Sequence, residues 1–399
     1  MIPVKNLNFL IKPASSLCNL RCRYCFYADE AANRAQASMG LMSDGTVDLL
    51  LAEAFRTVDR HGLVSFTFQG GEPTLAGLDF FQSFVQKAGA LCPSDVKTAF
   101  SIQTNGVLLD SEWAEFFRRE DFLVGLSIDG FKELHNAHRV NGEGGTWNAV
   151  HRQAESLLRR GVRTNALCVV TAQCARSPQK VYASLKKLGF DYMQFIACID
   201  PMGAERGRAP FSLTPRAYGE FLCALFDLWY RDWERGEYHS IRLFEDYIHI
   251  LLRDGSSTCA TCGQCGSYFV VEGDGSVYPC DFFALDTWRM GRLGEQSLVE
   301  MADGETSRRF LAWGREKPAQ CTSCPWRQLC GGGCKNDWVQ EPEGIRNYYC
   351  EAFQMLFAHG IERMMTMARA EQAQRVDRTG AWRRPGRSPQ VQGDGRGEF

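Results

Sequence analysis

Three closely spaced cysteines constrain this chain more than any other feature of its sequence. Cys18, Cys22 and Cys25 follow the apolar run 7–11 at C-x3-C-x2-C spacing. Thiolates this close in sequence cannot all pair with one another, but they can converge on one soft-metal centre. Iron–sulfur clusters normally take four cysteine ligands, so three from one loop leave one iron open to a substrate or cofactor. We call residues 18–25 the first cysteine loop.

Zinc and free core thiols are the alternatives for this loop. A structural zinc site usually combines paired C-x2-C half-sites with a fourth ligand. No histidine and no fourth cysteine stands near the first cysteine loop. The spacing therefore favours a cluster with one open iron.

Composition narrows the class of protein. A chain of 399 residues can bury a large core and suggests two or three domains. Its 45 basic and 47 acidic residues nearly balance, so nothing indicates a nucleic-acid or membrane-surface partner. The N-terminus lacks the apolar stretch of a signal peptide, and no apolar run is long enough to span a membrane. Seventeen cysteines in such a chain indicate metal binding in a reducing cytoplasm rather than a secreted disulfide framework.

Between residues 7 and 198, short apolar runs alternate with longer amphipathic ones. This alternation predicts an α/β fold in which βαβ crossovers build a parallel sheet, here a partial (β/α)6 barrel. In such folds the chemistry gathers at the carboxyl ends of the strands. The predicted strands are 7–11, 64–68, 99–103, 123–128, 165–170 and 192–196, and the predicted helices include 44–60, 78–90, 111–119, 146–160 and 178–188.

Several of the predicted strands end in motifs that could bind a ligand. Gln69-Gly70-Gly71-Glu72 follows the second strand, and its glycines would let the backbone approach a ligand closely, although Gly-Gly before proline is most often only a tight turn. Asn105-Gly106 and Asp129-Gly130 are ordinary turn dipeptides. Ser127 stands at a strand end, where its hydroxyl could reach a ribose or a carboxylate. Arg139 could pair bidentately with a carboxylate, the alternative being a solvated surface arginine.

A second group of cysteines lies between residues 259 and 350. The helical stretch 212–253 leads to it, with Thr214 as the expected cap. Gly273-Asp274-Gly275-Ser276 predicts a hairpin that returns Cys280 close to Cys265. A zinc ribbon using the C-x2-C pair at 321 and 324 is the alternative here. The five scattered cysteines are expected to be buried apolar residues, and they are Cys92, Cys168, Cys174, Cys198 and Cys223.

The pattern predicts four segments along the chain. A barrel covers 1–211, a helical bridge 212–255 and a cysteine-rich domain 256–368. The tail 369–399 is rich in Arg, Gln, Gly and Pro, and we expect it to be disordered because it can contribute little to a core.

Together these motifs resemble the radical S-adenosylmethionine (SAM) enzymes that carry a SPASM domain, and among them the anaerobic sulfatase-maturating enzymes. The resemblance covers roughly residues 5–365 and rests on the stretches 11–16, 68–77 and 273–282. Such enzymes oxidise a cysteine or serine in a Cys/Ser-x-Pro-x-Arg motif of a sulfatase to Cα-formylglycine without oxygen.

The resemblance implies SAM and three 4Fe–4S clusters. The SAM-binding cluster would be held by Cys18, Cys22 and Cys25. The first auxiliary set would be Cys259, Cys265, Cys280 and Cys334, and the second auxiliary set Cys321, Cys324, Cys330 and Cys350. Cys262 is left over as an unligated thiol. The implied SAM contacts are Tyr24, Gly71, Ser127, Arg139 and Ile199.

The resemblance also assigns a general base and partners. Asp281, directly after Cys280, would take a proton from the substrate. Its alternative role is an aspartate bonded to the backbone at a hairpin end. Gln69 and Tyr24 are candidate contacts for the substrate peptide. The implied partners are an unfolded or nascent sulfatase polypeptide and an electron donor such as flavodoxin or ferredoxin.

Two other functions stay open at this point. One is a SPASM radical SAM enzyme that forms a thioether or carbon–carbon cross-link in a ribosomal peptide. Such enzymes usually carry a peptide-binding extension, and none is apparent before residue 7. The other is a zinc-stabilised binding or scaffold protein.

Overall fold

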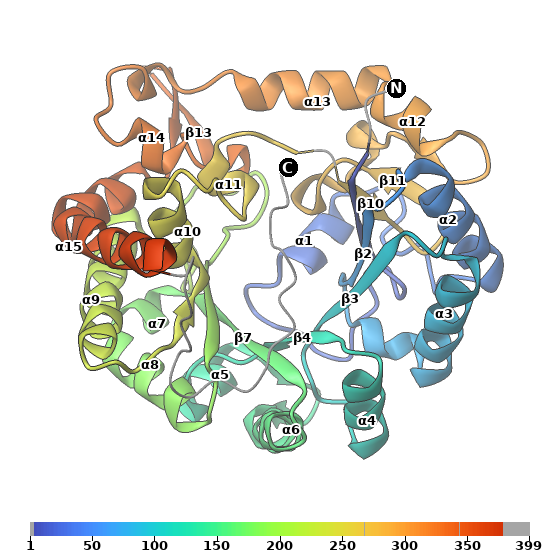
Figure 1. Cartoon of the computed structure of the whole chain (residues 1–399), viewed down its shortest axis with the longest axis horizontal. Coiled ribbons are helices and arrows are strands. Elements are labelled where there is room, and N and C mark those ends of the chain that lie inside the picture. The colour runs from blue at the N-terminus through green and yellow to red at the C-terminus, as the bar shows by residue number, and fades with distance from the viewer. Residues whose placement is uncertain (1–3, 267, 343, 378–399) are drawn as a thin grey trace.

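A mostly parallel sheet of ten strands organises the molecule, in the order β12-β11-β10-β1-β2-β3-β4-β7-β8-β9. The computed structural model describes residues 4–266, 268–342 and 344–377. In Figure 1 the strands form an open arc whose outer side is lined by helices. This arrangement confirms the predicted α/β partial barrel.

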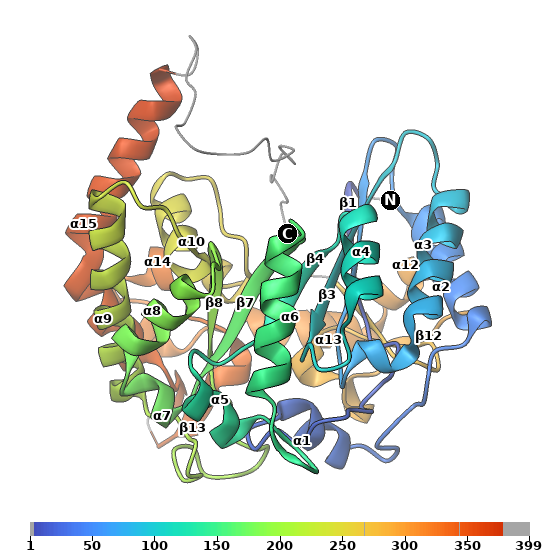
Figure 2. The same cartoon turned by 90° about the horizontal axis from the view of Figure 1, so that it is seen from below.

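All six predicted barrel strands are present and pair in parallel with their neighbours. They are β1 (Asn6–Ile11), β2 (Leu63–Phe68), β3 (Lys97–Thr104), β4 (Leu123–Ser127), β7 (Arg163–Val170) and β8 (Tyr192–Ala197). The five predicted helices lie between them as α2 (Asp44–Thr57), α3 (Leu78–Leu91), α4 (Ser111–Arg119), α6 (Trp147–Arg159) and α8 (Pro178–Lys187). Figure 2 shows α4 and α6 standing outside the strands.

Shorter elements complete the barrel half of the chain. They are α1 (Phe26–Ala32), α5 (Lys132–His138), β5 (Val140–Asn141), β6 (Gly144–Gly145) and α7 (Ala172–Ala175). The predicted helical bridge is α9 (Pro215–Glu234), β9 (Ser240–Ile241) and α10 (Arg242–Leu251). Thr214 caps α9 as predicted, because its hydroxyl accepts a hydrogen bond from Ala217 N at 3.3 Å.

The two faces of the barrel sheet differ in character because successive side chains of a strand point to opposite faces. Phe66 and Phe68 of β2 are fully buried and meet Phe84 of α3 edge-on. The alternate residue Thr67 hydrogen-bonds the hydroxyl of Ser101 across the other face at 2.8 Å. The main core therefore lies between sheet and helices, and the opposite face is polar at Thr67 and Ser101.

The scattered cysteines follow their prediction only in part. Cys168, Cys174 and Cys198 are buried, whereas Cys92 and Cys223 are only partly buried. Their burial in the core agrees with a structural role for the first three.

The cysteine-rich half is joined to the barrel through the sheet itself. The predicted hairpin is β10 (Phe269–Val271) and β11 (Ser276–Tyr278), and β10 pairs in parallel with β1, Phe9 opposite Phe269. The remaining elements are α11 (Cys259–Cys262), β12 (Gly291–Arg292), α12 (Leu298–Ala302), α13 (Glu305–Arg315), α14 (Arg327–Cys330), β13 (Trp338–Glu341) and β14 (Gly344–Asn347). The hairpin prediction is confirmed, and its place beside β1 is a feature that the sequence did not predict.

A long helix, α15 (Cys350–Asp377), ends the described chain. It packs along α9 and α10, as Figures 1 and 2 both show. The predicted tail therefore begins too early, since residues 369–377 continue this helix. The rest of that tail, 378–399, lies outside the described residues. Among the described residues, no helix is both long and apolar enough to cross a membrane.

Candidate active site

The first cysteine loop runs from β1 to α1 at the carboxyl end of the barrel strands. Leu20 N donates a hydrogen bond to Cys18 Sγ at 3.4 Å, and Asn105 Nδ2 lies 3.9 Å from the same sulfur. Amide donors of this kind stabilise a thiolate that binds metal. Burial raises the pKa of Cys18 and raises that of Cys22 to about 12, and the nearby Cys25 adds to both rises. The thiols therefore stay protonated until a metal displaces the protons.

The Gly-Gly-Glu motif packs directly on this loop. Gly71 N donates to Ser15 O and Glu72 N to Leu17 O, each at 2.8 Å. A Cβ atom on Gly71 would overlap the Leu17 carbonyl, so this close approach requires glycine. The buried Glu72 carboxylate accepts from Thr104 Oγ1 and Asn105 N, both at 2.7 Å, which fixes the motif to the end of β3.

Arg139 is buried in an ion pair, so the surface alternative for it is wrong. Its Nε donates to Asp129 Oδ2 at 3.0 Å, and the Tyr24 hydroxyl donates to the same oxygen. Val169 N donates to the other oxygen of Asp129 at 3.0 Å. Burial alone would raise the pKa of Asp129, but Arg139 and His135 bring it below its ordinary value. The sequence did not predict that Tyr24 and Arg139 share this carboxylate.

The implied SAM contacts come from five different places around the barrel mouth. Tyr24 and Arg139 meet at Asp129, and Gly71 lies against the first cysteine loop. Ser127 ends β4, and Ile199 follows β8. Their roles toward SAM stay predictions.

Asp281 is held by side chains of the barrel. It begins a short 3-10 turn after Cys280 and is 5% exposed. Its Oδ2 accepts hydrogen bonds from Tyr27 OH at 2.6 Å and from Gln69 Nε2 at 3.2 Å. Its Oδ1 has no hydrogen-bond partner among the described residues, although Lys12 Nζ lies 3.5 Å away. The carboxylate is therefore bonded to side chains of the barrel and not to the backbone, and its Oδ1 lies buried beside Lys12.

A buried group of charges surrounds this carboxylate. Lys12 Nζ lies 2.8 Å from Glu30 Oε1 and 3.7 Å from Glu272, and Arg34 pairs with both glutamates. Three carboxylates thus share two cations. Burial raises the pKa of Asp281, Lys12 and Tyr27 limit the rise, and Glu272 adds to it. A carboxyl with a raised pKa accepts a proton more readily than an exposed aspartate does.

Sequence analysis missed Tyr27 and Lys12. Of the two predicted substrate contacts, Gln69 and Tyr24, the Tyr24 hydroxyl donates to Asp129. Tyr27 bonds both Gln69 and Asp281, so it links the two candidates that were predicted. Tyr27 stands only two positions after Cys25, but its partner Asp281 lies 254 positions further along the chain.

Within each predicted auxiliary set, several cysteines are electrostatic neighbours, and the ligand assignment stays a prediction. Burial raises the pKa of Cys334, and Cys280 and Cys259 add to the rise. Burial likewise raises the pKa of Cys330 to about 11, with Cys350, Cys321 and Cys324 adding to it. Between them Gly331, Gly332 and Gly333 all have positive φ, so the chain turns from one group to the other within three residues. Four thiols in each group fit a 4Fe–4S cluster.

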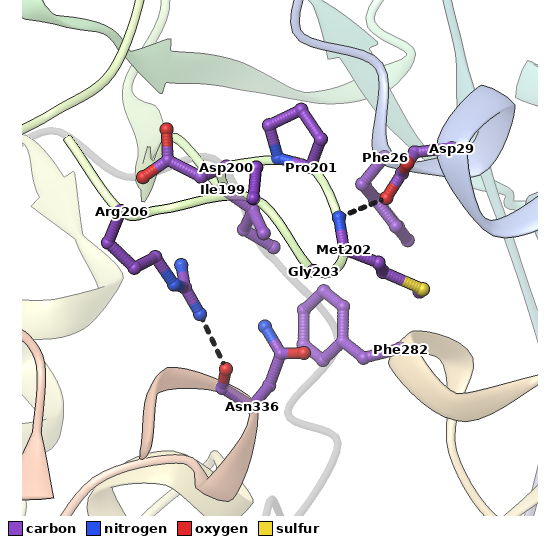
Figure 3. A pocket seen from close by; sticks show the side chains of 11 residues that line it. Phe26, Asp29, Ile199, Asp200, Pro201, Met202, Gly203, Arg206, Phe282 and Asn336 are labelled. Atoms are coloured by element: carbon purple, nitrogen blue, oxygen red, sulfur yellow. Dashed lines mark hydrogen bonds between the residues drawn. The ribbon is translucent and has the colours of Figure 1, made fainter. Parts of the chain in front are cut away.

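A cavity of about 220 Å³ opens between the two halves of the chain (Figure 3). Phe26, which follows Cys25, and Phe282, which follows Asp281, stand on its wall. The loop after β8 supplies Ile199, Met202 and Arg206, and Met202 N donates to Asp29 at 2.8 Å. The cavity therefore adjoins both the first cysteine loop and Asp281.

One polar group of this cavity lacks a partner. Arg206 Nη2 donates to Asn336 O at 2.7 Å, and the guanidinium lies 5.5 Å from the Tyr348 ring centre. Its Nη1 is buried without a hydrogen-bond partner among the described residues. A buried donor without an acceptor is costly, so this atom marks a place where a bound molecule would supply a carbonyl or carboxylate.

Comparison with known proteins gives consistent matches over most of the chain. The Radical SAM superfamily matches residues 13–172, and SPASM, an iron-sulfur cluster-binding domain, matches residues 246–325. The chain is 41% identical to the cysteine-type anaerobic sulfatase-maturating enzyme of Clostridium perfringens strain 13, over 91% of this chain and 98% of that protein. It is 31% identical to the serine-type enzyme of Bacteroides thetaiotaomicron, over 89% of each chain.

One solved structure matches this chain over a similar share of its length. Native anSMEcpe with bound AdoMet and Cp18Cys peptide matches with a TM-score of 0.86 and 40% identity, over 92% of this chain and 99% of that one.

Proposed function

Because this chain belongs to the anaerobic sulfatase-maturating enzymes, we propose that it oxidises a cysteine of a sulfatase polypeptide to Cα-formylglycine. The observation that carries the proposal is Asp281, a buried carboxylate that Tyr27, Gln69 and Lys12 surround. Of these neighbours, Tyr27 comes just after the first cysteine loop and Lys12 just before it. A cysteine substrate is favoured over serine because the cysteine-type relative is 41% identical and the serine-type one 31%.

The residues present suit the cofactors of this family. The first cysteine loop would hold the 4Fe–4S cluster that binds SAM, and the two auxiliary sets would hold one cluster each. SAM, when bound at that cluster, supplies the radical that takes a hydrogen atom from the substrate Cβ. Gly71 would offer its close backbone approach to SAM, with Tyr24, Ser127, Arg139 and Ile199 around it.

Asp281 would accept the proton that the substrate thiol must lose. Tyr27 and Gln69 both donate to Oδ2, which leaves Oδ1, buried beside Lys12, as the oxygen that would take the proton. Burial keeps water from competing for this oxygen. Lys12, at 3.5 Å, keeps the carboxylate anionic before the proton arrives, since burial alone would favour the neutral acid.

The substrate polypeptide would lie in the cavity beside Asp281. Phe26 and Phe282 offer apolar surface for the proline of a Cys-x-Pro-x-Arg motif. Arg206 Nη1 would donate to a peptide carbonyl, which supplies its missing partner. In solved anSMEcpe a Cp18Cys peptide is bound together with AdoMet, and that neighbour supports a peptide site of this kind.

The partners follow from the same proposal. The substrate would be an unfolded or nascent sulfatase, because the reactive residue must reach the buried carboxylate of Asp281. A flavodoxin or ferredoxin would supply the electron that starts the reaction. We place the enzyme in the cytoplasm, where thiols and cluster ligands stay reduced, and none of the seventeen cysteines forms a disulfide in the structure.

Mass spectrometry of two peptides tests the proposal. A Cys-x-Pro-x-Arg peptide and its serine counterpart are incubated anaerobically with reconstituted enzyme, SAM and a strong reductant. We expect a loss of about 18 Da on the cysteine peptide and a slower loss of about 2 Da on the serine peptide, the mass changes of conversion to an aldehyde. SAM cleavage with neither peptide altered would contradict sulfatase maturation and favour a different peptide modification.

A further inference from the structure

A lysine is buried beside the first auxiliary set without a carboxylate partner. Lys335 directly follows Cys334 and is 3% exposed. Its Nζ donates to Phe310 O at 2.6 Å, and no carboxylate pairs with it among the residues that the structure describes. A buried charge without a counter-charge is expensive, so an ammonium persists in such a place only when an anion stands close by.

Aromatic rings hold this ammonium from several sides. Nζ lies 3.0 Å from the ring centre of Phe310, 4.6 Å from that of Trp313 and 5.7 Å from that of Phe283. The three rings pack on one another, with Phe283 edge-on to both others at 5.5 and 5.3 Å. Ring faces attract a cation, but they do not neutralise its charge. The three rings therefore fix the position of the ammonium, and its positive charge still acts on neighbouring groups.

That neighbour is the first auxiliary set. A Cβ atom on Gly314 would lie 2.7 Å from Cys265 Sγ and 3.6 Å from Lys335 Nζ, so sulfur and ammonium share one small space at the end of α13. Cys265 is within side-chain hydrogen-bond reach of Lys335, and Cys280 and Cys334 lie near it. The groups that compensate the buried lysine are thus thiols of one predicted ligand set.

We propose that Lys335 raises the reduction potential of the 4Fe–4S cluster that the first auxiliary set would hold. A 4Fe–4S cluster gains a negative charge on reduction, and its potential depends on nearby charge and on hydrogen bonds to its sulfurs. A fixed cation therefore stabilises the reduced form. Lys335 is a positioning residue in this scheme, because it acts on the substrate only through the cluster.

The inference rests on the proposed function, in which the substrate must lose one more electron. Removal of a hydrogen atom from Cβ leaves a carbon radical, and formation of the C=S bond then releases one proton and one electron. Asp281 would accept the proton, and the electron would pass to the cluster that the cysteines of the first auxiliary set would hold. Asp281 adjoins Cys280 in the chain, so acceptor and base stand together. A higher potential makes this transfer more favourable.

Redox titration followed by electron paramagnetic resonance tests the inference. The whole protein, anaerobically reconstituted, is compared with Lys335→Gln, Lys335→Met and Lys335→Arg after iron and sulfide contents are matched. In the glutamine and methionine variants we expect one cluster signal to move to lower potential by at least about 59 mV, which is a tenfold change for a one-electron couple. Lys335→Arg keeps the charge and should keep the potential. Lys180→Met, an exposed lysine far along the chain, is the control without a shift.

Two outcomes of this titration would overturn the proposed effect of Lys335 on the cluster potential. Unchanged midpoint potentials in Lys335→Gln at full iron content would overturn the inference. Glutamine keeps a donor for the Phe310 carbonyl, so it should load iron even if methionine does not. Loss of one cluster in all three variants, arginine included, would show a purely structural role and also overturn it. The potential is measured without substrate, so a failure of the wild-type protein to convert the peptide would count against the proposed function alone.

Discussion

At the scale of single residues, the contact between Asp281 and the barrel side chains carries most of the functional argument. Tyr27 and Gln69 place the carboxylate, and burial raises its pKa. For Asp281→Asn we expect SAM cleavage to continue while formylglycine falls by about 100-fold or more, since asparagine keeps the shape but cannot take a proton. The ratio of 5′-deoxyadenosine to modified peptide measures this uncoupling. The control is Asp286→Asn, in the next turn, which should leave this ratio unchanged. If the ratio were also unchanged in Asp281→Asn, Asp281 would not be the general base.

The unpaired Nη1 of Arg206 leads to a prediction about substrate affinity. Arg206→Met keeps the length of the side chain but removes the donors, so KM for the peptide should rise about tenfold while SAM cleavage without peptide stays unchanged. Arg208→Met is the matched control, because Arg208 stands on the same loop, its side chain is 73% exposed, and its ion pair among the described residues is with Glu205. Steady-state kinetics over a range of peptide concentrations separates the two variants. An equal KM in both would place the peptide elsewhere.

His135 should make the fold sensitive to acid. Its Nδ1 accepts from Asp129 N at 3.3 Å, and burial lowers its pKa to about 4. A lowered histidine pKa gives stability that is present above pH 6.5 and is lost as pH falls towards 4. Between pH 8 and pH 5 we expect His135 to account for a loss of about 2 kcal/mol. His135→Asn, whose Oδ1 can accept the same bond, should be less stable at pH 8 yet lose less on acidification. Denaturant midpoints of both proteins at the two pH values check this, and parallel losses would contradict it.

At the scale of elements, the sequence predicts what is local and misses what is distant. The six barrel strands and the β10–β11 hairpin follow from apolar periodicity and turn residues, which act over a few positions. The pairing of β10 with β1 could not be predicted, because both are short apolar runs and nothing local specifies a partner. The same limit applies to the site. Residue spacing predicted the cysteines. The roles of Tyr27 and Lys12 could not be predicted, because they depend on contacts with the distant Asp281.

The Gly-Gly-Glu turn gives a prediction for one element. A Cβ on Gly71 would overlap the Leu17 carbonyl, so Gly71→Ala must push this turn away from the first cysteine loop. We expect SAM affinity to fall by about tenfold or more while the fold is retained. Gly89→Ala in α3 is the control, since a Cβ there meets nothing within 4 Å and should stabilise the helix by about 1 kcal/mol. Equilibrium dialysis measures the SAM affinity of both variants. Undiminished binding by Gly71→Ala would separate this turn from the SAM site.

At the scale of the whole molecule, the cysteine-rich half and the barrel form one sheet. Lys12 N donates to Val271 O at 2.8 Å, and Lys12 also bridges towards Glu272 and Asp281, so backbone and charge contacts cross the predicted domain boundary together. The second auxiliary set is tied in by α15, which begins at Cys350 and packs on α9. Separate folding of the two halves would expose the edge of β1 and leave buried charges unpaired.

This continuity predicts a single cooperative unit. Under native conditions, amide hydrogens of β1 and β10 should exchange with the same opening free energy, because neither strand can leave the sheet without exposing the other. Amides of the two-stranded sheet β13–β14 should exchange through smaller openings, since that sheet pairs with no barrel strand among the described residues. Hydrogen exchange followed by mass spectrometry on the reconstituted protein compares the three segments. If β10 opened at a clearly lower free energy than β1, the cysteine-rich half would be a separate folding unit. Asp281 would then reach the barrel by docking instead of through a shared sheet.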